Sequence, residues 1–81
     1  MRTTVFVRPK TGILDPQGEA VERSLRELGF PVGEARVGRV IDLEVDAADA
    51  DGARAAAEEM CRRLLANPLI ESYEVAVEAA T

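Results

Sequence analysis

The 81-residue sequence contains no histidine and no tryptophan, and its only cysteine is Cys61. Without histidine, neither a Ser-His-Asp triad nor a Cys-His pair can be assembled within the chain, and the commonest general base and metal ligand is missing. A single cysteine cannot close an internal disulfide. These absences argue against hydrolases, structural zinc sites and disulfide-stapled mini-domains. We therefore expect no catalytic residue, no metal site and no cofactor in this chain.

Aromatic residues, basic charge and long apolar runs are also scarce. The three aromatic residues, Phe6, Phe30 and Tyr73, are too few and too scattered to stack nucleic-acid bases. The net charge of −5 argues against neutralising a phosphate backbone. No apolar run approaches the ~20 residues of a membrane span, and residues 1–20 lack the apolar stretch of a signal peptide. We expect a cytoplasmic protein that binds neither nucleic acid nor a membrane.

The composition that remains, 47% hydrophobic and 31% charged, is typical of one small domain over residues 1–81. A chain of this length buries only about 60% of its unfolded surface when it folds, so we expect oligomerisation to add stability. Charge is distributed unevenly, because residues 1–40 carry +2 and residues 41–81 carry −7. Such polarity favours docking to unlike surfaces, although solvated faces account for most of these side chains.

The first half of the chain predicts a strand followed by a helix. Residues 3–8 are β-branched, aromatic or basic, and Pro9 ends this strand because it lacks a backbone donor. Asp15 is a suitable N-cap and Pro16 suits the first helical position. The helix that follows ends at Gly29, and its apolar face carries Val21, Leu25 and Leu28.

The second half predicts strand, helix and strand. Residues 35–45 alternate with period two, and Gly38 and Arg39 mark a kink, a bulge or a tight turn. Unbroken parity favours one long bent strand whose end projects past its sheet. An alanine-rich helix then begins at Asp49 or Asp51 and ends before Pro68, with an apolar stripe of Ala53, Ala57, Met60 and Leu64. The last strand includes Ile70 and residues 73–77.

This β-α-β(β)-α-β order predicts an α+β, ferredoxin-like fold. Two helices should pack on one face of a small, mainly antiparallel sheet of three or four strands. The opposite face, which carries Phe6, Val40 and Ala76, and at least one strand edge should stay uncovered. Pairing of strand edges with a second copy across a two-fold axis would cover them, so we expect a homodimer.

Two polar segments stand out. The loop from Lys10 to Gly18 ends at a capped helix N-terminus and could hold an anion or a partner's carboxylate; capping alone explains Asp15 and Pro16 equally well. Capping does not explain Gly18, which costs up to ~1 kcal/mol in a helix and indicates close approach by another backbone. Glu71 should pair with Lys10 or an arginine, within or between subunits. Cys61 is expected to be a half-buried, inert thiol.

Four segments, taken in order, resemble the PurS family, the small subunit of phosphoribosylformylglycinamidine (FGAM) synthase: KTGILDPQG (10–18), LG (28–29), RVGR (36–39) and CRRLLANPLIESY (61–73). The resemblance implies a non-catalytic subunit of a glutamine-hydrolysing, ATP-dependent ligase of purine biosynthesis. Such a subunit forms dimers, sometimes tetramers, and bridges a glutaminase subunit and a synthetase subunit to support ammonia transfer. ATP and magnesium would be bound by the synthetase.

Carried over by position, the resemblance implies nine residues in partner contacts: Lys10, Asp15, Pro16, Gln17, Gly18, Gly38, Arg39, Asn67 and Glu71. Arg39 stands where the family often has lysine, which keeps the charge but changes the donor geometry. Two alternatives remain open. One is an ACT-like dimeric sensor of a small molecule, whose melting temperature its ligand should raise. The other is a generic structural adaptor.

Overall fold

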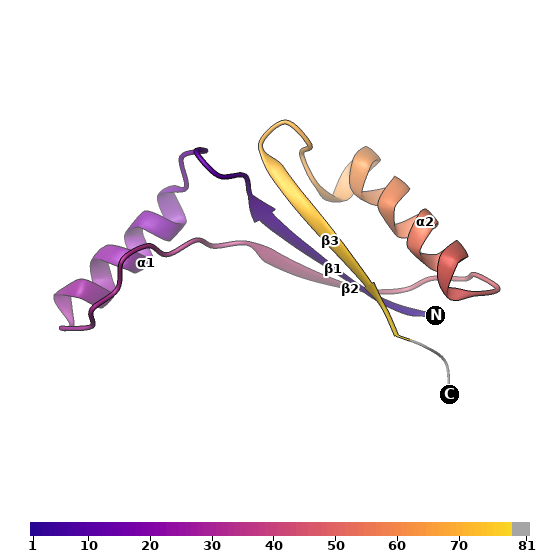
Figure 1. Ribbon diagram of the computed structural model, residues 1–81, viewed down its shortest axis with the longest axis horizontal. Coiled ribbons are helices and arrows are strands. Elements are labelled where there is room, and N and C mark those ends of the chain that lie inside the picture. The colour runs from indigo at the N-terminus through magenta and orange to yellow at the C-terminus, as the bar shows by residue number, and fades with distance from the viewer. Residues whose placement is uncertain (79–81) are drawn as a thin grey trace.

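The structure is a computed structural model that describes residues 1–78, so the last three residues of the domain expected over 1–81 lie outside the described part. Strands and helices alternate along the chain (Figure 1). The elements are β1 (Arg2–Pro9), α1 (Pro16–Glu27), β2 (Arg39–Glu44), α2 (Ala50–Met60), a π-helical segment η1 (Cys61–Leu65) and β3 (Glu71–Val77).

The three strands form an antiparallel sheet in the order β2-β1-β3. In this register Phe6 on the central strand lies between Val40 on β2 and Glu74 on β3. The side chains of β1 alternate between the two faces, and Thr3, Val5 and Val7 are fully buried. The predicted α+β class, with two helices and a small antiparallel sheet, is confirmed, and the sheet has three strands within the described residues.

Helix α2 covers one face of the sheet. Its N-cap is Asp49, whose carboxylate accepts a hydrogen bond of 2.7 Å from the Gly52 amide. The core lies between α2, η1, β1 and β3, and its buried apolar residues are Val5, Val7, Ala57, Cys61, Ala66 and Val75. Small side chains on α2 let its axis lie close to the sheet.

The predicted apolar stripe of the second helix is wrong in its last turn. Met60 is 38% exposed and Leu64 is 83% exposed, whereas Cys61 is fully buried. The buried line runs in ordinary four-residue steps from Ala53 to Ala57 and Cys61, so Met60 lies beside it. The wider π-helical turn of η1, in which the Ala66 amide bonds the carbonyl of Cys61 five residues earlier, then carries the line on to Ala66. The thiol that we expected to be half-buried is buried completely.

Helix α1 does not lie on the sheet, contrary to the prediction that both helices cover one face. It stands beyond the end of the sheet (Figure 1), and no α1 side chain contributes to the buried core. The chain is accordingly elongated, 49 × 30 × 14 Å, with a radius of gyration of 15.8 Å. A compact domain of this length would have about 12 Å.

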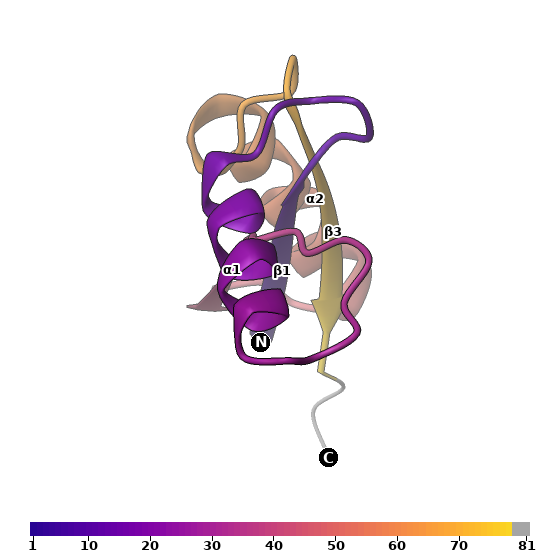
Figure 2. The same cartoon turned by 90° about the vertical axis from the view of Figure 1, so that its left-hand side faces the viewer.

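Polar side chains hold α1 against the residues that follow it. We call residues 28–38 the return segment, and α1 together with the return segment the arm. The two parts of the arm run side by side (Figures 1 and 2). Asp15 accepts a hydrogen bond from the Val37 amide at 2.9 Å, Glu22 accepts one from the Ala35 amide at 3.1 Å, and Arg26 donates to the carbonyls of Val32 and Gly33. These bonds leave the apolar face of α1 uncovered.

The return segment enters β2 without a hairpin. Residues 35–38 continue the course of β2 past the end of the sheet (Figure 1), as the unbroken parity of residues 35–45 indicated, although β2 itself begins only at Arg39. Gly38 packs directly against the backbone of β1, where a Cβ atom would collide with the Val7 carbonyl oxygen. This close approach joins the arm to the sheet.

The sheet face opposite α2 is uncovered, as expected. Val40 is 59% exposed on it, but polar pairs surround the apolar residues. The Thr4 hydroxyl donates to Asp42 at 3.0 Å, and Arg8 lies 3.7 Å from Glu74. This face can therefore stay in water. Within residues 1–78, no helix has the length and apolar character needed to cross a membrane.

Replacing Gly38 should destabilise the protein. Gly38→Ala forces β1 and the return segment apart, and we expect it to lower the free energy of unfolding by about 1–3 kcal/mol. Gly33→Ala is the matched control, since no atom lies within 4 Å of its added Cβ, and should change stability by less than about 0.5 kcal/mol. Urea unfolding of both variants measures the difference. Equal stabilities would contradict the close approach at Gly38.

Candidate partner-binding groove

A groove with a volume of ≈ 230 Å³ lies where the arm meets the sheet. The loop after β1, the start of α1, the return segment and the start of β3 contribute its walls. Of the nine residues predicted to contact partners, five line it: Asp15, Gln17, Gly38, Arg39 and Glu71. The other four do not line it: Pro16 and Gly18 flank Gln17 in the sequence, Lys10 follows the lining residue Pro9, and Asn67 comes four residues before Glu71. The structure thus brings together Asp15 and Glu71, which are 56 residues apart in the chain.

Asp15 has two roles at the groove. Its Oδ1 accepts a hydrogen bond of 3.0 Å from the Gly18 amide and caps α1, with Pro16 at the first helical position. Its Oδ2 accepts the bond from the Val37 amide. These bonds, the one from Val37 above all, lower the pKa of the Asp15 carboxyl below its usual range. Asp15 therefore fixes the arm, and its oxygens are already occupied.

Gly18 is buried at the start of α1, as its unfavourable helix propensity indicated. A Cβ atom at this position would meet the backbone carbonyl oxygen of Ala35 and the carboxylate of Asp15. The predicted close approach of another backbone is confirmed, and that backbone is the return segment of the same chain. Gly18 and Gly38 together let the return segment lie against both α1 and β1.

Arg39 and Glu71 form a bidentate ion pair across the groove wall. The two nitrogen-oxygen distances are 2.6 Å and 3.1 Å, and Arg39 also donates to the Leu65 carbonyl at 2.5 Å. Glu71 accepts a further bond of 2.7 Å from the Asn67 amide, while Asn67 Oδ1 accepts one from the Leu69 amide. The expected pairing of Glu71 with an arginine is confirmed, and it occurs within the subunit. This pair joins β2, the end of η1 and the start of β3.

Lys10 and Gln17 keep their polar groups available. The Lys10 amide donates to the Ile70 carbonyl at 2.9 Å, but its ammonium group forms no ion pair with residues 1–78. Gln17 is exposed, and its side chain makes no hydrogen bond inside the described part of the chain. An ammonium and an amide beside a groove offer donors to a partner's carboxylates or carbonyls.

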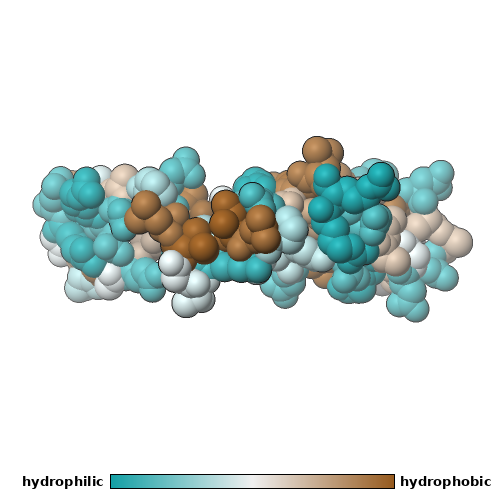
Figure 3. Space-filling view, turned by 90° about the horizontal axis from the view of Figure 1, so that it is seen from above, coloured by the Kyte–Doolittle hydropathy of each residue, from teal (hydrophilic) through white to brown (hydrophobic). Residues whose placement is uncertain are grey.

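Apolar side chains in the two loops beside the groove were missed by the sequence reasoning. Ile13 is 38% exposed, Leu14 72%, Leu69 82% and Ile70 43%. Ile13, Leu14 and Ile70 line the groove itself. Figure 3 shows hydrophobic side chains gathered at the middle of the long face of the molecule. The sequence signal that could have revealed them is a pair of adjacent apolar residues in each loop, where the hydrophobic pattern has neither helical nor strand periodicity.

The groove therefore offers two kinds of contact for docking, exposed apolar side chains and unused hydrogen-bond donors. Cys61 lies outside it, and burial raises the pKa of its thiol, which keeps it protonated and unreactive. Residues 1–78 contain no group of three or more side chains suited to hold a metal ion.

The ion pair predicts a specific pH dependence. The Arg39 guanidinium, and then the Asn67 amide, hold the pKa of Glu71 below its ordinary value of 4.5. A lowered pKa in the folded state means that the stabilisation is present above pH 4.5 and is lost as the pH falls through the lowered value. Glu71→Gln should lower the free energy of unfolding at neutral pH and reduce its decline between about pH 6 and about pH 3.

Glu74→Gln is the control for this measurement, because Glu74 is on the same strand but its side chain is 73% exposed. It should keep the pH dependence of the unsubstituted protein. Urea unfolding at a series of pH values gives both curves. If Glu71→Gln loses stability toward acid as steeply as the unsubstituted chain, the ion pair does not contribute as described.

Comparison with known proteins identifies the family. Residues 2–79 match the family PurS, Phosphoribosylformylglycinamidine (FGAM) synthase. The phosphoribosylformylglycinamidine synthase subunit PurS of Methanocaldococcus jannaschii is 38% identical over 78 residues, which cover 95% of this chain and 94% of the relative. The corresponding subunit of Thermotoga maritima is 43% identical over 72 residues, 88% of each chain.

Solved structures agree with the sequence relatives. The crystal structure of PurS from Methanocaldococcus jannaschii superposes with a TM-score of 0.87 at 37% identity, covering 99% of this chain and 98% of that one. A chain in the structure of PurLQS from Thermotoga maritima superposes with a TM-score of 0.85 at 39% identity, covering 93% of each. The resemblance carried by residues 10–18, 28–29, 36–39 and 61–73 is thereby confirmed, and the chain belongs to the PurS family of FGAM synthase subunits.

Proposed function

We propose that this chain is the non-catalytic small subunit of a cytoplasmic FGAM synthase, and that it docks the glutaminase subunit to the ATP-dependent synthetase subunit. The complete enzyme converts formylglycinamide ribonucleotide, ATP, glutamine and water into FGAM, ADP, phosphate and glutamate. ATP and magnesium belong to the synthetase in this proposal. The observation that carries it is the groove, which gathers five of the nine residues assigned to partner contacts.

The chemistry of ammonia explains why such a subunit is needed. Ammonia released from glutamine into neutral water is mostly protonated, and ammonium is not a nucleophile. The two active sites must therefore be held together with water excluded between them. A rigid groove wall, fixed by the Arg39–Glu71 pair, would position the docked surfaces, and the exposed apolar residues Leu14 and Leu69 would exclude water when covered.

The proposal includes a homodimer, because the arm leaves an apolar surface without cover. Val21 on α1 is 43% exposed, and in the return segment Leu28 is 73% and Phe30 55% exposed. Helix α2 packs on β1 and β3, so Ile41 and Leu43 of β2 remain only half-buried. Reciprocal placement of α1 from one copy over β2 of the other would cover both surfaces.

Both outer strands can add to this dimer. β2 and β3 are the two edges of the sheet, and the edge-to-edge pairing expected from the sequence stays part of the proposal. Association of two such dimers would give a tetramer. Burial of the apolar faces would offset the limited core of a short chain, whose fully buried side chains are no larger than valine, threonine and cysteine.

Docking is tested by reconstitution. The purified chain is mixed with the glutaminase and synthetase subunits, ADP and glutamine, and a three-component complex should co-elute in size-exclusion chromatography. Gln17→Ala combined with Asn67→Ala should leave the dimer folded but weaken docking about tenfold, since one side-chain amide that lines the groove and one from the loop before Glu71 are removed. Glu27→Ala, an exposed change on α1 away from the groove, should dock normally. Undiminished docking of the double variant would remove the groove from the interface.

The dimer is tested separately. Val21→Glu places a charge on the uncovered face of α1 and should shift the protein from dimer to monomer in sedimentation equilibrium, because burying that charge is unfavourable. Ala20→Glu introduces the same side chain one position away, on a different side of the helix, and should leave the dimer intact. A dimer that persists in Val21→Glu would exclude this face as the interface.

A further inference from the structure

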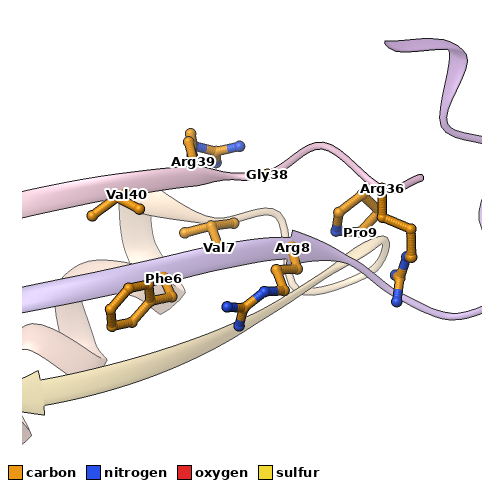
Figure 4. A pocket seen from close by; sticks show the side chains of 8 residues that line it. All are labelled: Phe6, Val7, Arg8, Pro9, Arg36, Gly38, Arg39 and Val40. Atoms are coloured by element: carbon orange, nitrogen blue, oxygen red, sulfur yellow. The ribbon is translucent and has the colours of Figure 1, made fainter. Parts of the chain in front are cut away.

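A second groove, of ≈ 440 Å³, lies at the fork where β1 and the return segment separate (Figure 4). Phe6 and Val40 contribute apolar surface on the sheet face opposite α2, and Pro9 and Gly38 mark the point of separation. The volume is within the range of small-molecule sites, roughly 300–1,000 Å³. None of its charged residues other than Arg39 was assigned a role by the sequence reasoning.

The charged residues that line this groove are all arginines, although the whole chain has a net charge of −5. Arg39 is committed to Glu71, and Figure 4 shows its side chain on the other side of the ribbon from those of Arg8 and Arg36. Arg36 is exposed and forms no ion pair with residues 1–78. The positive charge in the groove therefore comes from Arg8 and Arg36.

Neither of these two arginines is strongly neutralised. Arg8 has one weak ion pair, at 3.7 Å from Glu74, and its guanidinium lies 5.7 Å from the centre of the Phe6 ring. Arg36 is near enough to Asp15 to affect its carboxylate, but both Asp15 oxygens accept hydrogen bonds from backbone amides. The Arg8 guanidinium at the Phe6 ring and the Arg36 guanidinium farther along the groove are thus left to interact with something outside the chain.

We propose that this groove binds a nucleotide, with Arg8 and Arg36 holding its phosphate and with Phe6 and Val40 contacting its base. A guanidinium presents a planar fork of donors that matches the oxygens of a phosphate. An aromatic ring provides a stacking surface for a base. The site goes beyond the coupling role, since docking of two subunits requires no ligand on this chain.

The charge pattern of the sheet face favours a compact anion over an acidic protein segment. The basic residues are at the Gly38 end of the face, whereas Asp42, Glu44 and Glu78 are toward the other end. An acidic protein segment that lies along the strands would be attracted by the arginines at the Gly38 end. A few residues farther along, the carboxylates of the sheet face would repel it. A single phosphate at the Gly38 end meets Arg8 and Arg36, and the nearest acid on this face is Glu74, which is 3.7 Å from Arg8.

The test is a titration of the isolated chain, followed by NMR or calorimetry, with AMP, adenosine and inorganic phosphate as probes. AMP should bind saturably, and adenosine, which lacks the phosphate, should bind at least about tenfold more weakly. Arg36→Ala should weaken AMP binding by about tenfold or more without changing the melting temperature, because Arg36 is exposed. Phe6→Val should weaken binding of AMP but not of inorganic phosphate.

Arg23→Ala is the matched control, since it removes an exposed arginine from α1 and should leave AMP binding unchanged. Absence of saturable AMP binding would overturn the proposal, as would equal loss in the Arg23 and Arg36 variants or equal affinity for AMP and adenosine. If Arg36→Ala blocks co-elution with the partner subunits while the chain alone binds no AMP, the groove is a protein-docking surface. The titration results are independent of whether the coupling role holds, because no partner is present in that experiment.

Discussion

The carboxylate of Asp15 is the contact on which the rest of the arm depends. One oxygen holds the Gly18 amide and starts α1, and the other holds the Val37 amide, 22 residues away. The return segment is thereby fixed beside α1 and led to β1, where only glycine fits at position 38. Because the binding between α1 and the return segment is polar, the apolar face of α1 has no cover within the described chain.

A similar division of roles runs through the groove. Arg39 and Glu71 neutralise each other and shape the wall, so the charged residues that stand out in the sequence act mainly inside the chain. What remains for a partner is Lys10, Gln17 and the exposed apolar side chains of the flanking loops. A binding surface held by such internal contacts is rigid before the partner binds. Less conformational entropy is therefore lost on association. These properties suit the coupling role that we propose for this chain.

Much of this structure could be predicted from the sequence, because period-two alternation, Asp15 and Asp49 as caps, and Pro16 are local signals. The position of α1 could not be predicted, because the side chains of Asp15, Glu22 and Arg26 form hydrogen bonds with backbone groups. Such bonds produce no periodic pattern in the sequence. The π-helical turn that leads from Cys61 to the buried Ala66 has no sequence signature either. At the site, the pairing of Glu71 with an arginine followed from its chemistry, but the choice of Arg39 required the fold.

The most direct test compares glutamine with free ammonia as nitrogen source. The glutaminase and synthetase subunits are assayed for FGAM formation with and without this chain, at a pH where enough ammonia is unprotonated. The account predicts that omitting the chain abolishes synthesis from glutamine and leaves synthesis from ammonium salts unchanged, because only the transfer between sites is lost. Equal synthesis from glutamine with and without the chain, or loss of both reactions on omission, would contradict a coupling role.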